Sequence, residues 1–216
     1  MIGDIHGCSK TFKKLILEKI NIKKSDKIYC LGDYIDRGPD SKGVIDFILN
    51  LRNKGYNIHT LRGNHEEMML NSDKDEKSFL HWTKNGGDKT LESFEINSIK
   101  NIKPEIRNFI KRTKFFISTK NFLLVHAGLN FSIENPLLDK ESMLWIRNFS
   151  INEDFLNGRI LIHAHTPKTR DQIISQQFES PYNLDGGCVF KNKEEYGSLF
   201  ALNFHDRTLL EVKNID

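Results

Sequence analysis

The hydrophobic positions of the first sixty residues switch between helical and strand-like spacing. Apolar side chains recur every three or four residues after Ser9 and again after Ser41, which predicts two amphipathic helices. Both serines are suitable N-caps, and Gly55 is a suitable stop for the second helix. The short runs 27–31 and 57–61 are predicted to be strands, and the first of them is largely apolar. This alternation is typical of βαβ units with a parallel sheet, so we predict an α/β fold.

The first strand of this series is short. Only Met1 and Ile2 precede Gly3, whereas a strand in a core usually has about 5 residues. We therefore expect a first strand that is cut short, and weaker local support for the residues that follow it.

The pattern changes after Glu66. From there to about Lys114 it is helical and more polar, with a turn expected at 81–87 and a second helix start at Pro104. Short strands with intervening turns then follow at 115–118, 122–125, 160–162, 172–175, 198–203 and 208–212. We predict a second, more antiparallel sheet packed on the first. The chain 1–216 is predicted to be one domain with a helical insertion at about 66–114.

Composition narrows the class of protein. Of the 216 residues, 38% are hydrophobic and 28% are charged, which suits a soluble globular protein. A net charge of only +3, with scattered lysines, argues against a nucleic-acid partner, and no long apolar run or signal-peptide pattern indicates a membrane. Cys8, Cys30 and Cys188 lack zinc or redox spacing, so we expect buried, reduced thiols. We therefore expect a cytoplasmic protein that is a monomer or a weak oligomer.

Clusters of Asp, Asn and His recur where apolar runs end. They are the segments Gly3–Gly7, Gly32–Gly38, Gly63–Glu66, His126–Gly128 and His163–Thr166. Because functional residues collect on loops at the edge of a sheet, five such clusters predict one site.

The residue types in these clusters indicate a metal centre. The candidate ligands are Asp4, His6, Asp33, Asn64, His126 and His165. Oxygen and nitrogen donors without a thiolate suit Mn, Fe or Zn. Asp4 and His6 alternate, so both can point the same way, and Asp33 could bridge two ions. Two ions about 3.5–4 Å apart would clamp a phosphoryl group and generate hydroxide at neutral pH.

Two arginines and a histidine predict the substrate. Arg37 follows Asp33 on the same loop, and Arg147 lies between the later histidine clusters. Guanidinium groups bind phosphate through two hydrogen bonds, so these residues favour a phosphate ester. His65 adjoins the candidate ligand Asn64, and Asp36 could hold one of its ring nitrogens. An imidazolium held in this way is a suitable general acid for an alkoxide leaving group.

Together, these motifs resemble those of the phosphoprotein phosphatase branch of the calcineurin-like metallophosphoesterases, in particular its compact bacterial and phage-type members. The resemblance runs from the first residues to Thr166, with Ala164 where the family usually has glycine. It implies an α/β/β/α sandwich of two mixed sheets flanked by helices, and a dinuclear Mn²⁺-type centre. It implies Asp4, His6 and Asp33 on one ion, with Asp33, Asn64, His126 and His165 on the other.

The same resemblance implies the other site residues. Arg37, Asn64 and Arg147 would bind phosphate, and an Asp36–His65 pair would serve the leaving group. A hydroxide held by the metals would attack directly, without a phosphoenzyme. We therefore expect a hydrolase of the Ser/Thr protein phosphatase type, acting on a phosphorylated protein or a small phosphoester.

Two alternatives stay open. The first is a symmetrical dinucleoside-tetraphosphate (Ap4A-type) hydrolase, which the chain resembles in size and in Gly3–Gly7. Asp36 favours the phosphatase, since the Ap4A hydrolases depart from an acid at the matching position. The second is an inactive metal-binding regulatory module, against which the intact set of His65, Asp36 and Arg37 argues.

Several nearby residues receive structural roles. Glu66 and Glu67 are expected to begin a helix, where carboxylates favour the helix dipole. His163 is expected to pack behind the site, and Asp185 to orient a loop or a ligand. Trp82 and Trp145 are expected in the core.

Overall fold

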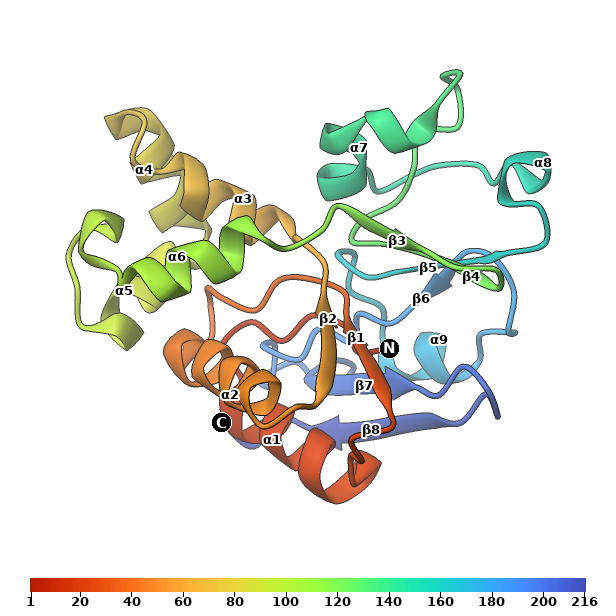
Figure 1. The fold of residues 1–216 in the computed structure, drawn as a ribbon, viewed down its shortest axis with the longest axis horizontal. Coiled ribbons are helices and arrows are strands. Elements are labelled where there is room, and N and C mark those ends of the chain that lie inside the picture. The colour runs from red at the N-terminus through yellow and green to blue at the C-terminus, as the bar shows by residue number, and fades with distance from the viewer.

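The computed structural model describes residues 1–216, in which eight strands form two sheets flanked by helices (Figure 1). The strands are β1 (Lys27–Cys30), β2 (Asn57–Thr60), β3 (Phe116–Ser118), β4 (Phe122–Val125), β5 (Ile160–His163), β6 (Tyr182–Asn183), β7 (Ser198–Leu202) and β8 (Leu209–Lys213). The α-helices are α1 (Ser9–Lys14), α2 (Ser41–Asn53), α3 (Asn64–Asn71), α4 (Glu76–Trp82), α5 (Asp88–Phe94), α6 (Pro104–Lys111), α7 (Lys140–Trp145), α8 (Glu153–Leu156) and α9 (Arg170–Ile174). Short π or 3-10 turns are η1 (Leu15–Ile20), η2 (Thr83–Gly87), η3 (Ile99–Asn101) and η4 (Pro136–Leu138).

The first three residues lie in the middle of the first sheet. β1 pairs in parallel with β2, and β7 pairs antiparallel with β8. Ile2 bridges the two pairs, since it lies parallel to Cys30 and antiparallel to Ala201. Its N–H donates to the carbonyl of Tyr29 at 2.8 Å. The segment is short, as expected, but the expectation of weak support was wrong, because strands on both sides hold it.

The second sheet has the order β3-β4-β5-β6. Only β3 and β4 pair antiparallel, whereas β4, β5 and β6 run parallel to one another. The prediction of a second sheet more antiparallel than the first was therefore wrong, although the family-based expectation of mixed sheets is confirmed. The crossovers that parallel pairing requires are provided by the long connections that carry α7, α8 and α9.

One predicted strand is a helix. Residues 172–175 were expected to be extended, but α9 covers Arg170–Ile174. A capping box explains the difference: the Gln172 backbone N–H donates to the Thr169 hydroxyl, and the Thr169 backbone N–H donates to the Gln172 side chain. These two local hydrogen bonds favour a helix over the extended form.

Alternation along the strands builds four layers. In β1, Ile28 and Cys30 pack towards α1 and α2, whereas Tyr29 packs with the second sheet. In β4, Leu124 faces the first sheet, and Leu123 faces outward onto α7 and α8. Because strand side chains alternate between faces, each sheet buries two apolar surfaces. The result is the α/β/β/α sandwich, with two sheets packed face to face.

The helix starts differ in detail from the sequence prediction. α2 is capped by Asp40, whose carboxylate accepts from the N–H of Gly43 at 2.7 Å. The expected cap, Ser41, is the first residue of the helix instead. Pro104 begins α6 as predicted. None of the helices combines the length and the apolar character that a membrane span requires.

Candidate active site

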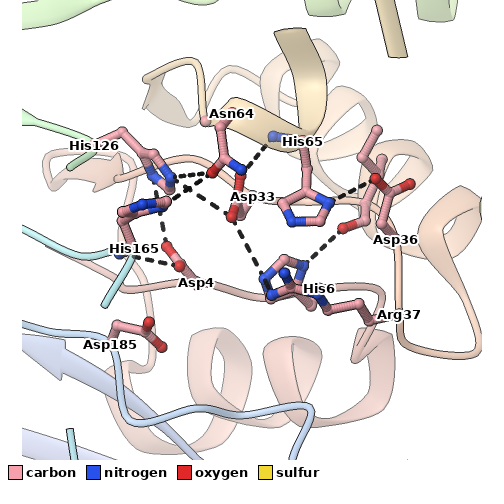
Figure 2. Close-up of polar contacts among 12 residues, drawn as sticks. Asp4, His6, Asp33, Asp36, Arg37, Asn64, His65, His126, His165 and Asp185 are labelled. Atoms are coloured by element: carbon pink, nitrogen blue, oxygen red, sulfur yellow. Dashed lines mark hydrogen bonds and ion pairs between the residues drawn. The ribbon is translucent and has the colours of Figure 1, made fainter. Parts of the chain in front are cut away.

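The polar clusters meet at the carboxyl ends of neighbouring strands (Figure 2). Asp4 and His6 follow the short first segment, and Asp33 follows β1. Asn64 and His65 begin α3, directly after β2. His126 follows β4 and His165 follows β5. All of these side chains are at least nine-tenths buried.

The backbone is strained at the same place. Nine residues other than glycine have positive φ, and five of them belong to the predicted site: His6, Asp33, Asp36, Arg37 and His165. Such conformations cost of order 1–3 kcal/mol each, so they persist only where the surrounding structure imposes them. Close packing of the loops is one such constraint. A side chain at Gly32, where φ is +112°, would lie 2.7 Å from the backbone nitrogen of Gly63.

The first donor group contains His6, Asp33 and His65, whose possible ligand atoms lie within 4.8 Å of one another. Nδ1 of His6 donates to the carbonyl of Ile35 at 2.9 Å. That bond leaves a lone pair on Nε2, which lies 3.4 Å from Oδ2 of Asp33. A backbone carbonyl that fixes the tautomer in this way is typical of metal-binding histidines.

The second donor group contains Asp33, His126 and His165, again within 4.8 Å. Nδ1 of His126 donates to the carbonyl of Leu31 at 2.9 Å. Its Nε2 lies 3.5 Å from Oδ2 of Asp33 and 3.0 Å from Oδ1 of Asn64. Asn64 Oδ1 is also 3.0 Å from Nδ1 of His165. Asp33 is therefore common to both groups.

Electrostatics leave these donors ready for a cation. Burial lowers the pKa of His6 and His126, and lowers that of His165 to about 3, so the imidazoles are neutral. Burial alone would raise the pKa of Asp33, but the surrounding histidines hold that pKa below its usual range. A carboxylate and neutral imidazoles are the protonation states that metal ions require.

Two buried atoms lack a partner and test the fit of a metal. Oδ1 of Asp4 and Nε2 of His165 make no hydrogen bond. Burial, Asp185 and Asp33 raise the pKa of Asp4, so negative charge is crowded here. Leaving a buried acceptor without a partner costs about 1–3 kcal/mol. Divalent cations bound at these two positions would satisfy both atoms, so the donor set fits a metal centre.

A second set of hydrogen bonds fixes Asp36 and His65. Nδ1 of His65 lies 2.7 Å from Oδ2 of Asp36. The same carboxylate accepts from Nε1 of Trp82 at 2.9 Å and from the hydroxyl of Thr90 at 2.6 Å. The hydroxyl of Ser41 also accepts from the Asp36 backbone N–H. The pair is thus held from α2, α4 and α5 together.

Glu66 ties two ligand loops together, which the sequence did not reveal. Its carboxylate accepts from the backbone N–H groups of Asp33, Tyr34 and Gly63, at 2.8–2.9 Å. Burial raises its pKa to about 8, and the charge of Asp33 adds to the shift. Glu66 does begin α3 as predicted. Its reach across to the β1 loop had no signal in the sequence beyond its place beside His65.

Arg37 lies beside the site and contacts His6, one of the candidate metal-binding residues. Its Nη1 is 2.9 Å from Nε2 of His6, so it donates to the lone pair that would bind a metal. Arg147 lies on the exposed loop after α7 and makes no hydrogen bond or ion pair with the other predicted residues. Both assignments to phosphate therefore stay predictions.

The structure also places the other residues that were singled out from the sequence. Trp82 is buried as expected, whereas Trp145 is 39% exposed and turns the edge of its ring to His165, which corrects its assignment to the core. His163 packs against Phe149 behind the site. Asp185 accepts from the backbone N–H of Gly187 and so orients a loop, as predicted. The three cysteines are buried and free.

Comparison with known proteins identifies the family to which this chain is similar. The sequence profile of the Calcineurin-like phosphoesterase family matches residues 1–206. The Serine/threonine-protein phosphatase 1 of Salmonella typhimurium is 40% identical over 88 residues, which are 41% of this chain and 38% of that protein. The symmetrical Bis(5'-nucleosyl)-tetraphosphatase of Wigglesworthia glossinidia brevipalpis is 46% identical over 71 residues, 32% of this chain and 25% of that protein. The alignments thus span well under half of these relatives.

The fold also has a counterpart among solved structures. The crystal structure of a putative diadenosine tetraphosphatase superposes with a TM-score of 0.68 and 21% sequence identity, covering 100% of this chain and 92% of that one. At this identity the likeness concerns the fold alone.

Proposed function

The chain belongs to the calcineurin-like phosphoesterase family, and we propose that it is a metal-dependent phosphoric monoester hydrolase of the Ser/Thr protein phosphatase type. The observation that carries this proposal is the convergence of acceptor atoms around Asp33. Lone pairs of His6 and His126 meet this carboxylate, and Oδ1 of Asn64 lies against Nε2 of His126. Buried atoms of Asp4 and His165 have no hydrogen-bond partner. Such an arrangement favours bound cations over a purely structural polar network.

The residues divide between two ions in this proposal. Asp4, His6 and Asp33 would hold one, with His65 of the first donor group left for proton transfer. Asp33, Asn64, His126 and His165 would hold the other. We propose Mn²⁺, with Fe and Zn as the other metals that suit oxygen and nitrogen donors. Two bound divalent ions supply a Lewis acid for the phosphoryl group and make water a nucleophile at neutral pH.

The chain itself would supply the proton for the leaving group. The hydrogen bond to Asp36 takes Nδ1 of His65, which leaves Nε2 to carry a proton towards the site. A serine or threonine alkoxide is a poor leaving group, so protonation by a positioned histidine accelerates its departure. The intact Asp36–His65 pair is therefore our reason for placing phosphoproteins first.

Arg37 would bind the phosphate once a metal occupies the first donor group. Nε2 of His6 has one lone pair, and Arg37 uses it at 2.9 Å. A metal ion and this hydrogen bond exclude each other, so metal binding would free the guanidinium. A guanidinium freed in this way can form bidentate hydrogen bonds with two phosphate oxygens.

Hydrolysis of a dinucleoside tetraphosphate is the second candidate. The observation in its favour is the relative named a symmetrical Bis(5'-nucleosyl)-tetraphosphatase, which matches 32% of this chain at 46% identity. In that case the leaving group would be a nucleoside polyphosphate, which needs less help from a general acid.

The two candidates are separated by comparing rates on one preparation. The protein is stripped by a chelator and then assayed with Mn²⁺ on a panel of phosphopeptides, on Ap4A and on p-nitrophenyl phosphate. We expect no activity before Mn²⁺ and the highest kcat/KM on a phosphopeptide. A higher kcat/KM on Ap4A would favour the second candidate, and full activity after exhaustive chelation would refute a metal-dependent reaction.

A further inference from the structure

Asp185 follows its strand in the same way as a candidate metal ligand follows the neighbouring one. β5 and β6 run parallel, with His163 opposite Asn183. His165 and Asp185 therefore each lie two residues beyond a paired position. Because polar sites in such sheets form outside the carboxyl ends of the strands, Asp185 reaches the same edge as the metal ligands. Figure 2 shows it beside Asp4.

The backbone brings Asp185 against Asp4. A side chain at Gly3 would lie 2.1 Å from the carbonyl oxygen of Leu184, so the two segments touch where only glycine fits. The next residue of each segment is an aspartate. Their carboxyl groups are close enough for a hydrogen bond between them when one carries a proton. The pair of Asp4 and Asp185 is thus a result of the fold.

The loop that carries Asp185 is fixed by hydrogen bonds. The Asp185 backbone N–H donates to Oδ1 of Asn183 at 2.7 Å, and its carbonyl accepts from the N–H of Lys168 at 2.8 Å. Oδ1 of Asp185 accepts from the N–H of Gly187 at 2.9 Å. These bonds place the carboxylate but bring no positive charge to it.

Two buried carboxyl groups therefore lie together without a counter-charge. Asp4 is 3% exposed and Asp185 is 2% exposed, and neither forms an ion pair with a lysine or arginine, unlike Asp73, which faces Arg107. Burial raises the pKa of Asp185 to about 6, and the charge of Asp33 adds to the shift. Burying a carboxylate is costly unless it is paired or coordinates a metal. Oδ1 of Asp4 also lacks a hydrogen-bond partner, so this place suits a cation.

The protein itself offers one candidate for that cation. The charge of Arg37 acts on both Asp4 and Asp185. However, its Nη1 is engaged with Nε2 of His6 at 2.9 Å, and it makes no ion pair with either carboxylate. A metal ion held by Asp4, His6 and Asp33 would supply the missing charge at the same place.

We propose that Asp185 is part of the first metal position, where its carboxylate shares the positive charge of one ion with the carboxylate of Asp4. This position would then combine three carboxylates with one imidazole, a donor set that suits Mn²⁺. The inference rests on the metal centre of the proposed function and is independent of the substrate.

Asp185→Asn tests this role through two measurements with opposite signs. Asparagine keeps an acceptor oxygen for the Gly187 N–H, removes the charge, and offers an amide that can donate to Oδ1 of Asp4. One of the two Mn²⁺ ions should bind about 10–100-fold more weakly in a calorimetric titration. The thermal midpoint of the chelated protein should rise by about 2–4 °C, since two buried carboxyl groups no longer repel each other.

Asp171→Asn is the matched control, because it removes a carboxylate whose side chain is 97% exposed on α9. Neither measurement should change in this variant. Wild-type affinity for both Mn²⁺ ions in Asp185→Asn would overturn the proposal. A midpoint of chelated Asp185→Asn no higher than that of the wild type would overturn it as well, since the carboxylate would then serve the loop alone.

Turnover is measured separately, which distinguishes this inference from the proposed function. If Asp185→Asn weakens one of two Mn²⁺ ions but the wild type hydrolyses no phosphoester, the proposed function fails and the role of Asp185 stands. If hydrolysis depends on Mn²⁺ but Asp185→Asn binds both ions as the wild type does, the role of Asp185 fails and the proposed function stands.

Discussion

The two halves of the site are supported in different ways. The loops after β1 and β2 carry Asp36, His65 and Glu66, whose side chains are linked by buried hydrogen bonds to α2, α4, α5 and the backbone. The loops after β4 and β5 carry His126 and His165, which contact mainly Asn64, Asp33 and backbone groups. The only buried side-chain atoms without a partner, on Asp4 and His165, face this second half.

This difference separates what the protein orders by itself from what a cation would order. Around Asp36 every buried polar atom of the carboxylate has a donor, so the pair with His65 is pre-organised without metal. Around His165 the donor set is incomplete. We therefore expect substitutions in the first half to affect catalysis directly, and metal binding to stabilise the second half more than the first.

The largest expected effect is that of replacing His65, the proposed general acid. His65→Asn should lower kcat for a phosphoserine peptide by about 10²–10⁴-fold, because the alkoxide would leave without a proton. The loss should be smaller for p-nitrophenyl phosphate, whose leaving group needs little protonation. Steady-state kinetics on both substrates provide the check, and equal losses would count against this role.

Glu66→Gln should have the next largest effect. Glutamine offers one acceptor oxygen where the carboxylate accepts three backbone N–H groups, so at least one donor loses its partner. Metal affinity should fall about 10–100-fold, as is typical when a group that orients ligands is removed. Calorimetric Mn²⁺ titration measures this loss. Wild-type affinity in the variant would show that the loops hold their shape without Glu66.

Trp82→Phe should reduce kcat by a smaller factor, about tenfold, by removing the N–H that donates to Asp36 while keeping most of the ring. Trp145→Phe is the comparison in the second half, because Trp145 makes only an edge contact with His165 and no hydrogen bond. We expect a smaller change in kcat for Trp145→Phe. The reverse order would mean that the two halves are not supported as described.

Replacing His163 should have the smallest effect, which is a change in the pH dependence of stability. Burial lowers its pKa to about 4, below the ordinary value of 6.5, so the unfolded chain binds a proton more readily. This residue therefore contributes stability above pH 6.5 that is lost as pH falls towards 4, by at most about 1.4 kcal/mol per pH unit. The free energy of unfolding is measured by urea denaturation of the chelated protein at several pH values. In His163→Gln the contribution of this residue to the pH dependence should disappear. Identical slopes would mean that His163 is protonated in the folded state.

Local patterns in the sequence predicted much of the site. The glycine-flanked Asp and His clusters predicted a single site at strand ends. The place of His65 beside Asn64, together with the family resemblance, predicted a pair with Asp36, whose Oδ2 lies 2.7 Å from Nδ1 of His65. The four-layer sandwich followed from the resemblance and is confirmed. The motifs behind these predictions are short segments that can be recognised without knowledge of the rest of the fold.

The features that escaped prediction depend on contacts between distant segments. Trp82 reaches Asp36 across 46 positions, and nothing near Trp82 indicates this contact. Ile2 is supported by β1 and by β7, which lies about two hundred residues later. The parallel direction of β4, β5 and β6 likewise depends on the path of long loops, which hydrophobic periodicity does not encode.

The central claim is that Asp33 joins two donor groups into a dinuclear centre, and metal stoichiometry tests it most directly. Chelated wild-type protein and Asp33→Asn are titrated with Mn²⁺ in a calorimeter, with bound metal counted independently by elemental analysis after dialysis. We predict two ions per wild-type chain and at most one tightly bound ion in Asp33→Asn. One ion or none in the wild type, or two ions with unchanged affinity in the variant, would contradict the claim.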